Sequence, residues 1–288
     1  MEVVGSIDAF TDTLDAARQV GRTVGLVPTM GALHAGHRSL IVQAASECDH
    51  VGVTIFVNPL QFAEPEDIDR YPRTLDADLD VCREAGASTV LTPSITEMYP
   101  DWPAPVVTTV SVRGVADRWE GASRPGHFDG VATIVAKLFA MAGRGRAYFG
   151  EKDFQQVAVV RRMAADLSFP VTVVDCPTVR DPDGLALSSR NARLSGDERA
   201  AAVVLSRALA AGREVVAAGE DDPAVVTGTM AAVVATEPLV RLDYAVAVDP
   251  DDLVVPPTLP AAGVVRLLIA GWVGPVRLID NCAAPLPF

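Results

Sequence analysis

Two histidines lie close together near the start of the chain, in residues 28–37, which read PTMGALHAGH. Because His34 and His37 are three residues apart, they can share one face of the first turn of a helix. Two imidazoles on that face can donate hydrogen bonds to phosphate oxygens and balance charge as a phosphoryl transition state develops. Gly31 and Gly36 allow the backbone to approach a phosphate closely. The segment therefore predicts a site for chemistry at phosphorus.

Other patterns fit these residues less well. The dinucleotide fingerprint GxGxxG is absent, and the two glycines with GxxxxG spacing are followed by His37 and Arg38 where a P-loop has Lys-Ser/Thr. A zinc site could use the HxxH pair, but only His50 and His127 remain to complete it, and no glutamate lies within the pair. Two surface histidines without a role are the plain alternative, which the glycines and the position between an expected strand and helix disfavour.

Two further segments could bind phosphate. Residues 149–156 (FGEKDFQQ) place Gly150 and Lys152 at another expected strand-to-helix junction, where the lysine supplies a cation. Residues 184–191 (GLALSSRN) place two hydroxyls before Arg190, whose guanidinium can bind phosphate bidentately. Either string alone is more often a polar turn. Phosphate binding is favoured for the first segment because strand ends at one edge of a parallel sheet converge on one crevice. It is favoured for the second because this segment lies where a loop could close over a nucleotide.

Amide side chains follow the expected strand at residues 51–57. Asn58 comes directly after this strand, and Gln61 lies one turn further on. Neutral amides can both donate and accept hydrogen bonds, which suits a small hydroxy-acid substrate. Arg124, in the string RPGHF, is a candidate for binding a carboxylate or the released phosphates.

These segments must be positioned by the strands and helices around them, and the sequence alternates between β-branched runs and helical patterns. Over about the first 175 residues this alternation indicates an α/β fold with a mainly parallel sheet. The expected strands are 23–27, 51–57, 89–91, 147–149 and 171–175, and the expected helices are 37–47, 74–86, 131–141 and 154–166. Pro28 is expected to end the first strand. We therefore predict a Rossmann-like, doubly wound parallel sheet.

The character of the chain changes after Pro177. A polar, turn-rich stretch is followed by expected helices at 199–218 and 223–237 and by strands at 242–248, 264–269 and 276–279. Two helices and a few strands without βαβ alternation indicate a smaller C-terminal α+β domain. We predict domains at residues 1–178 and 179–288, with the boundary near Val179.

The composition excludes several classes of protein. With 49% apolar and 21% charged residues in 288 the chain is typical of a soluble globular protein, and its formal net charge of −13 argues against a nucleic-acid partner. No signal peptide and no apolar run near ~20 residues is visible, so we expect a cytoplasmic protein without a membrane partner. The cysteines share no metal-binding spacing and are expected to be buried thiols; they are Cys48, Cys82, Cys176 and Cys282.

Taken together, the motifs resemble the pantothenate synthetase family, part of the HxGH nucleotidyltransferase superfamily that includes class I aminoacyl-tRNA synthetases and small adenylyltransferases. The matching strings are VPTMGALHAGH, FVNPLQF, EDxxxYPRT (residues 66–74), EGASRPGHFDGV, FGEKDFQQ, DGLALSSRN and LIDN. They run from Val27 to Asn281, so the resemblance covers nearly the whole chain. In this order they are far more specific than any one string.

The resemblance implies an ATP-dependent condensation of (R)-pantoate with β-alanine, through pantoyl adenylate, to give pantothenate, AMP and diphosphate. It implies three catalytic residues: His34 and His37 stabilise the phosphates, His37 also as proton donor, and Lys152 bridges phosphates. Gln61 and Gln156 would bind pantoate, with Gln61 also binding β-alanine. The implied ATP-binding residues are Met30, Gly31, Ala32, Leu33, His34, Ala35, Gly36, His37, Gly150, Glu151, Lys152, Asp153, Val179, Leu187, Ser188, Ser189 and Arg190. Supporting positions with less defined roles are Asn58, Asp78, Arg124 and His127.

The resemblance further implies a homodimer whose C-terminal domain acts as a lid. Mg²⁺ would arrive with ATP, without a protein metal site or a tightly bound cofactor. Leu187 stands where some relatives have methionine, a tolerated apolar exchange, and Asp129 could vary without consequence. Alternatives are a nucleotidyltransferase that stops at an adenylated product and a silent nucleotide-binding regulator. A tRNA synthetase is disfavoured by the acidic charge.

Overall fold

The computed structural model describes residues 1–62, 68 and 71–286. The chain divides into two compact units. The N-terminal unit consists of Met1–Gly150 and Gln155–Pro177, and the C-terminal unit of Glu151–Phe154 and Thr178–Phe288. Within the described residues, no helix has both the length and the apolar character needed to cross a membrane.

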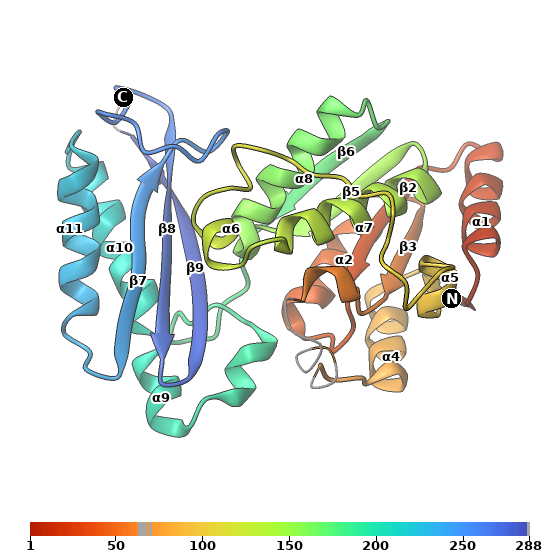
Figure 1. The fold of residues 1–288 in the computed structure, drawn as a ribbon, viewed down its shortest axis with the longest axis horizontal. Helices are drawn as coiled ribbons and strands as arrows, with labels where there is room; N and C mark the ends of the chain where they lie inside the picture. Colours follow the sequence, from red (N-terminus) through yellow and green to blue (C-terminus); the bar gives the residue numbers. More distant parts are fainter. Residues whose placement is uncertain (63–67, 69–70, 287–288) are drawn as a thin grey trace. The chain divides into compact units, whose positions relative to one another are not determined.

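The N-terminal unit is built on a six-stranded sheet with the order β1-β4-β3-β2-β5-β6, in which every neighbouring pair is parallel. Figure 1 shows β2, β3, β5 and β6 of this sheet. The strands are β1 (Glu2–Val4), β2 (Val24–Thr29), β3 (His50–Ile55), β4 (Thr89–Leu91), β5 (Gly145–Gly150) and β6 (Val171–Cys176). From β2 the chain winds to β3 on one side and later to β5 on the other, so the winding reverses at β2 and β5. This arrangement confirms the predicted doubly wound fold, and such a reversal is where open α/β sheets bind ligands.

Helices flank this sheet in two groups. Helices α1 and α7 pack against each other, as do α2 and α4. The core under α2 and α4 combines Val27 and Val53 of the strands with Leu40, Ile41 and Cys82 of the helices. The helices of this unit are α1 (Ile7–Gln19), α2 (Ala35–Glu47), α4 (Leu75–Ala85), α5 (Ile95–Met98), α6 (Glu120–Ser123), α7 (His127–Ala142) and α8 (Phe154–Asp166), with the 3-10 turn η1 (Pro59–Gln61).

The first predicted strand is longer than expected. Pro28 does not end β2, which continues to Thr29 and pairs with β3 as far as Ile55. On its other side β2 pairs with β5 only at Gly25 and Leu26. Because no ladder bond to β5 is formed at Pro28, the missing N–H breaks nothing on that side, and the proline ring tolerates the extended backbone. The sequence reasoning also did not predict β1, α1, α5 or α6.

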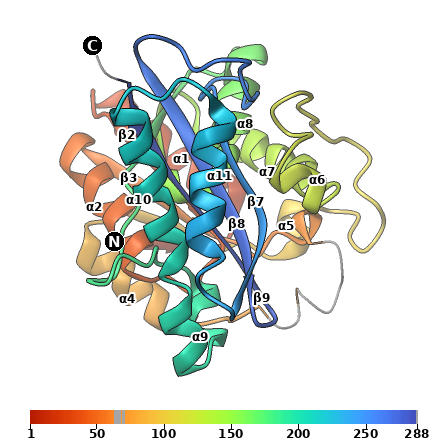
Figure 2. The ribbon, with the colours of Figure 1, turned by 90° about the vertical axis from the view of Figure 1, so that its left-hand side faces the viewer.

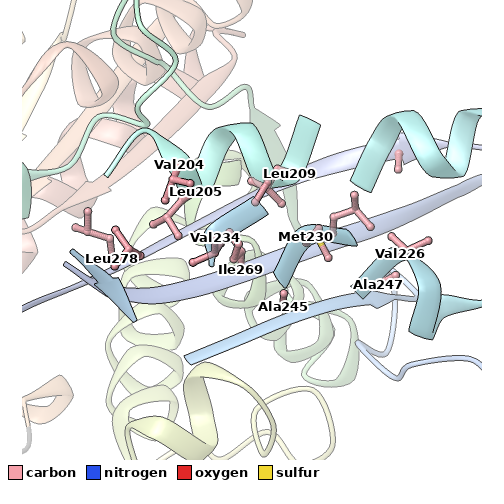
Figure 3. Close-up of a cluster of buried hydrophobic side chains, with 14 of the residues drawn as sticks. Val204, Leu205, Leu209, Val226, Met230, Val234, Ala245, Ala247, Ile269 and Leu278 are labelled. Atoms are coloured by element: carbon pink, nitrogen blue, oxygen red, sulfur yellow. The ribbon is translucent and has the colours of Figure 1, made fainter. Parts of the chain in front are cut away.

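The C-terminal unit is a three-stranded antiparallel sheet, ordered β7-β8-β9, covered on one face by two helices. Figure 2 shows these helices, α10 and α11, side by side. Figure 3 shows the core between helices and sheet, which includes Leu209 and Met230 of the helices and Ile269 of the sheet. The strands are β7 (Val240–Val248), β8 (Val264–Val273) and β9 (Val276–Pro285), and the helical segments are η2 (Glu151–Asp153), η3 (Ser189–Arg193), α9 (Gly196–Ala201), α10 (Val204–Ala217) and α11 (Pro223–Val234).

The single helix expected at residues 199–218 is two helices, α9 and α10. Ala202 and Val203 between them keep right-handed helical angles. The backbone N–H of Val203 donates to Ala200, and that of Leu205 to Ala202, so the hydrogen bonds span three residues instead of four. The interruption is a short tightening into 3-10 geometry.

Candidate functional site

The structure brings His34 and His37 together at the start of α2. His34 is the N-cap residue, and its Nδ1 accepts from the N–H of Gly36 at 3.1 Å, while Nδ1 of His37 accepts from the N–H of His34 at 3.3 Å. The ring centroids are 4.2 Å apart. Because Nδ1 accepts in both rings, the proton of each neutral imidazole resides on Nε2. Both histidines therefore carry an Nε2–H donor at the N-terminus of a long helix, where anions bind.

The turn before these histidines is held by a buried carboxylate. Asp78 of α4 is 2% exposed and accepts from the N–H of Ala32 at 3.0 Å, from the N–H of Leu33 at 2.7 Å and from Thr74 Oγ1 at 3.2 Å. Gly31 has φ of 85° and Ala32 of 52°, a conformation that an alanine rarely adopts. Charge-assisted bonds to two successive N–H groups offset this strain. Asp78, a predicted supporting position, thus fixes the backbone that leads into His34.

Asn58 organises the amide cluster that follows β3. Its side chain is 1% exposed, accepts from Tyr99 Oη at 2.8 Å, and donates to Gln61 Oε1 at 3.1 Å and to the carbonyl of Gly130 at 3.0 Å. Burial raises the pKa of Tyr99, which keeps its hydroxyl a donor. Gln61 Nε2 lies 2.9 Å from Met30 Sδ. The amide of Asn58 therefore positions Gln61 beside the turn that carries the histidines.

Arg124 and His127 contact the backbone of Gln61. His127 Nε2 is 3.0 Å from Arg124 Nη1, and His127 Nδ1 is 2.9 Å from the carbonyl oxygen of Gln61. The predicted residues Met30, Asn58, Gln61, Arg124 and His127 thus form one connected group within the N-terminal unit.

Two neighbouring glutamines at the start of α8 differ in their surroundings. Gln156, predicted to bind pantoate, is half-buried. Gln155 is buried, accepts from the N–H of Glu120 at 2.9 Å, and donates to the carbonyls of Val115 and Arg118, both at 2.8 Å. Gln155 therefore fixes the loop that leads into α6, a role that sequence reasoning missed because adjacent glutamines look alike before the helix phase is known.

Gly150 is the last residue of β5 in the N-terminal unit, and the remaining predicted residues belong to the C-terminal unit. Lys152 lies in η2, where its Nζ is 3.3 Å from Asp153 Oδ1 and its side chain is 17% exposed. The carbonyls of Glu151 and Lys152 both accept from Asn281 Nδ2, at 2.9 and 2.8 Å. Asn281 belongs to the string LIDN, to which the sequence assigned no role.

A hairpin-like loop brings the other predicted nucleotide ligands of this unit together. The N–H of Leu187 donates to the carbonyl of Val179 at 2.9 Å, and Ser188 Oγ accepts from the N–H of Arg190 at 3.3 Å, which caps η3. Arg180 binds the Asp280 carboxylate of β9 through both Nη atoms, at 2.6 and 2.8 Å. Burial opposes the charged guanidinium, but the hydrogen bonds and charge of Asp280 raise the pKa of Arg180 overall. The loop is thereby fastened to the sheet.

No group of three or more His, Cys, Asp or Glu side chains that could hold a metal ion lies within the described residues. The four cysteines are free thiols. Burial, with a smaller contribution from Asp78 and Asp280 respectively, raises the pKa of Cys82 and of Cys282 to about 11, so both thiols are protonated and poorly nucleophilic. Of the string EDxxxYPRT, Glu66, Asp67, Asp69 and Arg70 lie outside the described residues.

Comparison with known proteins gives consistent matches along the chain. Residues 2–283 match the family model described as Pantoate-beta-alanine ligase. The chain is 52% identical over 269 residues to a pantothenate synthetase of Salinispora arenicola, which covers 92% of each protein. It is similar to the crystal structure of pantothenate synthetase from Thermus thermophilus, with a TM-score of 0.91, 45% identity and 100% of both chains covered. It is also similar to the pantoate-beta-alanine ligase of Francisella tularensis complexed with beta-gamma ATP and beta-alanine, with a TM-score of 0.76, 32% identity and coverage of 98% of this chain and 97% of that one.

Proposed function

We propose, because this chain belongs to the pantoate–β-alanine ligase family, that its reaction passes through pantoyl adenylate. The enzyme is an ATP-dependent ligase that condenses (R)-pantoate with β-alanine to pantothenate. In the proposed first step the pantoate carboxylate attacks the α-phosphorus of ATP and diphosphate leaves. In the second step the β-alanine amine attacks the acyl carbon and AMP leaves. The observation that carries the proposal is the paired histidines at the start of α2.

The histidine turn is proposed to bind the ATP phosphates through residues 30–37. The Nε2–H groups of His34 and His37 donate to phosphate oxygens, and the N-terminus of α2 adds partial positive charge. Charge that builds on the phosphorus-bound oxygens as diphosphate leaves is stabilised by these fixed donors. His37 is proposed to act also as a proton donor, and Asp78 contributes by holding the turn.

The second set of proposed ATP ligands lies in the C-terminal unit and the residue before η2. Lys152 is proposed to bridge phosphates with its ammonium, which suits a point charge on a flexible stem. Ser188, Ser189 and Arg190 donate from the capped loop before and within η3. The remaining proposed ATP ligands are Gly150, Glu151, Asp153, Val179 and Leu187.

Pantoate is proposed to bind the amides of Gln61 and Gln156, with Gln61 also in contact with β-alanine. The support is the geometry around Gln61. Asn58 Nδ2 donates to the side-chain oxygen Oε1 of Gln61, which fixes the direction of the Gln61 amide. A fixed amide that both donates and accepts suits a hydroxy acid better than a polyphosphate. Arg124 and His127 are proposed to support this group through their contacts with the backbone carbonyl of Gln61.

Further features of the proposal follow the family resemblance. Mg²⁺ is proposed to arrive as MgATP, since this ion keeps much of its water and is usually held by substrate phosphates. We also propose a cytoplasmic homodimer in which residues 1–178 bind ATP and pantoate and residues 179–288 form a lid domain.

A single end-point assay tests the proposed reaction. AMP should form from ATP over many turnovers only when both pantoate and β-alanine are present. One pantothenate should form for each AMP. Formation of ADP would indicate an acyl-phosphate ligase instead. Accumulation of AMP or of an adenylated acid beyond one equivalent per enzyme, without any use of β-alanine, would indicate a nucleotidyltransferase.

A further inference from the structure

The turn that carries Lys152 is bound by a polar face of the C-terminal sheet. We propose that Asn281 of β9, together with the buried Arg266 of β8, is a positioning residue for Lys152. The proposal rests on the function proposed above for Lys152, the bridging of ATP phosphates. It assigns a role to the LIDN string that neither the resemblance nor the motif analysis supplied.

Asn281 contacts the turn through its amide nitrogen. Nδ2 donates to the carbonyls of Glu151 and Lys152 at 2.9 and 2.8 Å, while Oδ1 accepts from Arg266 Nε at 2.8 Å and also from Arg266 Nη2. Because a guanidinium has only donors, the amide oxygen must face Arg266 and the amide nitrogen must face the turn. With 4% exposure, Asn281 is shielded from water that could replace these bonds.

Arg266 reinforces the same turn. It is 4% exposed, its Nη2 is 3.3 Å from Glu151 Oε2, and its guanidinium lies 4.0 Å from the centroid of the Phe154 ring. A buried guanidinium stays charged and needs partners, and here two of them are Glu151 of the turn and Phe154, the residue that follows it. The turn and the arginine therefore satisfy each other, which fixes the turn against β8 and β9.

The two faces of the C-terminal sheet have different roles. Along β8, Leu267 and Ile269 point into the core under α10 and α11, so Arg266, one residue before Leu267, points to the opposite face. Asn281 pairs with Leu268 across the antiparallel ladder and shares the face of Arg266. One face of the sheet holds the helices, and the other holds the segment with Lys152.

Fixing the backbone of the turn restricts where the Lys152 ammonium can lie. A flexible lysine stabilises a developing charge only if its position is set before the reaction, because reorganisation during the reaction costs part of the benefit. Asn281 holds the carbonyl of Lys152 itself, so loss of this bond affects the origin of the side chain directly.

A double-mutant cycle tests the proposal in the full-length enzyme, with pantoate-dependent adenylation as the assay. Asn281→Asp keeps the size of the side chain and its acceptor for Arg266, but it turns a carboxylate oxygen towards the two carbonyls. We expect kcat to fall about tenfold, as for the net loss of one or two hydrogen bonds. In a Lys152→Ala background the same substitution should change kcat by less than about twofold, because Asn281 acts through Lys152.

Three further measurements keep the outcome decisive. Hydrogen exchange at the amides of residues 151–154 should accelerate in Asn281→Asp. Asp243→Asn, which breaks the exposed ion pair of Asp243 with Arg277 in the same sheet, should leave kcat and this exchange unchanged. If Asn281→Asp does not fold, Asn281→Ser, which is too short to reach both carbonyls and adds no charge, takes its place in the cycle.

The inference is overturned if Lys152→Ala is impaired but Asn281→Asp retains the wild-type kcat. It is also overturned if the effects of the two substitutions multiply, because Asn281 would then act independently of Lys152. A different result, full activity in Lys152→Ala, would refute the proposed function of Lys152 and leave accelerated exchange in Asn281→Asp as a purely structural finding.

Discussion

The two units of the molecule hold their proposed phosphate ligands in different ways. In the N-terminal unit the ligand turn lies between a strand and a helix of a parallel sheet, and Asp78 binds its backbone N–H groups. In the C-terminal unit Lys152 lies in the 3-10 turn η2, whose carbonyls Asn281 binds, and Asp280 binds Arg180 of the loop that leads into η3. Both turns are held by individual side chains, but only the position of the first follows from the topology of a parallel sheet.

This difference decides which substitutions are informative. In the first unit the connection between β2 and α2 sets the position of the turn, so the chemistry of a histidine can be removed while the turn remains. In the second unit, support comes from buried charged and amide groups, whose removal leaves partners unsatisfied. The predictions below separate chemistry from support, beginning with the largest expected effect.

Removing either imidazole should have the largest effect on turnover. His37→Ala and His34→Ala are expected to fold but to lose roughly 10²–10³ in kcat, as for loss of one transition-state donor. Because His34 also caps α2, its removal should cost about 0.5–2 kcal/mol of stability. His34→Asn, which restores a good N-cap without an imidazole, should recover the stability and not the rate.

Steady-state kinetics and urea unfolding check this prediction. Ser195→Ala, which removes the corresponding cap of α9, is the matched control and should lose stability with little change in rate. Near-wild-type turnover in both histidine variants would refute their role at the phosphates.

Substituting the buried carboxylate should affect both stability and rate. Asp78→Asn cannot accept from both N–H groups of the turn, so the free energy of unfolding should fall by roughly 2–4 kcal/mol. Because the turn leads into His34, kcat should also fall about tenfold. Asp76→Asn, at an exposed position in the first turn of the same helix, is the control. Unchanged kcat in a destabilised Asp78→Asn would show that the turn needs no fixed geometry for catalysis.

The proposed pantoate amides should show a selective effect on binding. Gln61→Ala and Gln156→Ala are expected to raise the Kd of pantoate about tenfold or more, as for a lost hydrogen bond, with a much smaller change for ATP. Isothermal titration with each substrate measures both constants. The control is Gln43→Ala, at a position of α2 where the glutamine donates to Glu47 at the surface. A larger change for ATP than for pantoate would contradict the assignment.

The smallest expected effect concerns acid stability at the opposite end of the sheet from the histidine turn. His50, in the first position of β3, is 9% exposed with Nε2 3.0 Å from Thr89 Oγ1, and burial, helped by the charge of Arg22, lowers its pKa below 6.5. The unfolded chain therefore binds more protons here, so this contribution to stability is complete above about pH 6.5 and is lost as the pH falls through the folded-state pKa.

His50→Gln, which cannot titrate, should show a shallower loss of stability on acidification than the wild type, by about 1 kcal/mol or less between about pH 7.5 and 5.5. Urea unfolding at the two pH values measures the difference. Equal slopes would show that His50 does not contribute to the acid sensitivity.

The elements around the histidine turn could be predicted from the sequence because they depend on local patterns. β2, α2 and β3 have apolar runs and helical spacing that predict them, and the strand-end rule then places His34, His37, Asn58 and Gln61 near one edge of a sheet. Pro28 was misjudged because the length of the β5 ladder cannot be known before the strands are paired.

The residues that hold the two turns in place could not be predicted from the sequence in this way. The bond from Asn281 to Lys152 joins residues 129 positions apart, and that from Asp78 to Leu33 joins residues 45 apart. Nothing in the type of an asparagine or aspartate specifies such a partner. Gln155 and Gln156 illustrate the limit at two adjacent helical positions, since the burial that separates their roles follows from tertiary packing alone.

The central claim is that adenylation of pantoate precedes any use of β-alanine, and isotope exchange tests it most directly. The enzyme is incubated with ATP, Mg²⁺, pantoate and labelled diphosphate in the absence of β-alanine. We predict that label enters ATP at a rate that depends on pantoate and that falls sharply in His37→Ala. Exchange that strictly requires β-alanine, or a product of ADP instead of AMP, would contradict the acyl-adenylate mechanism and the role given to the paired histidines.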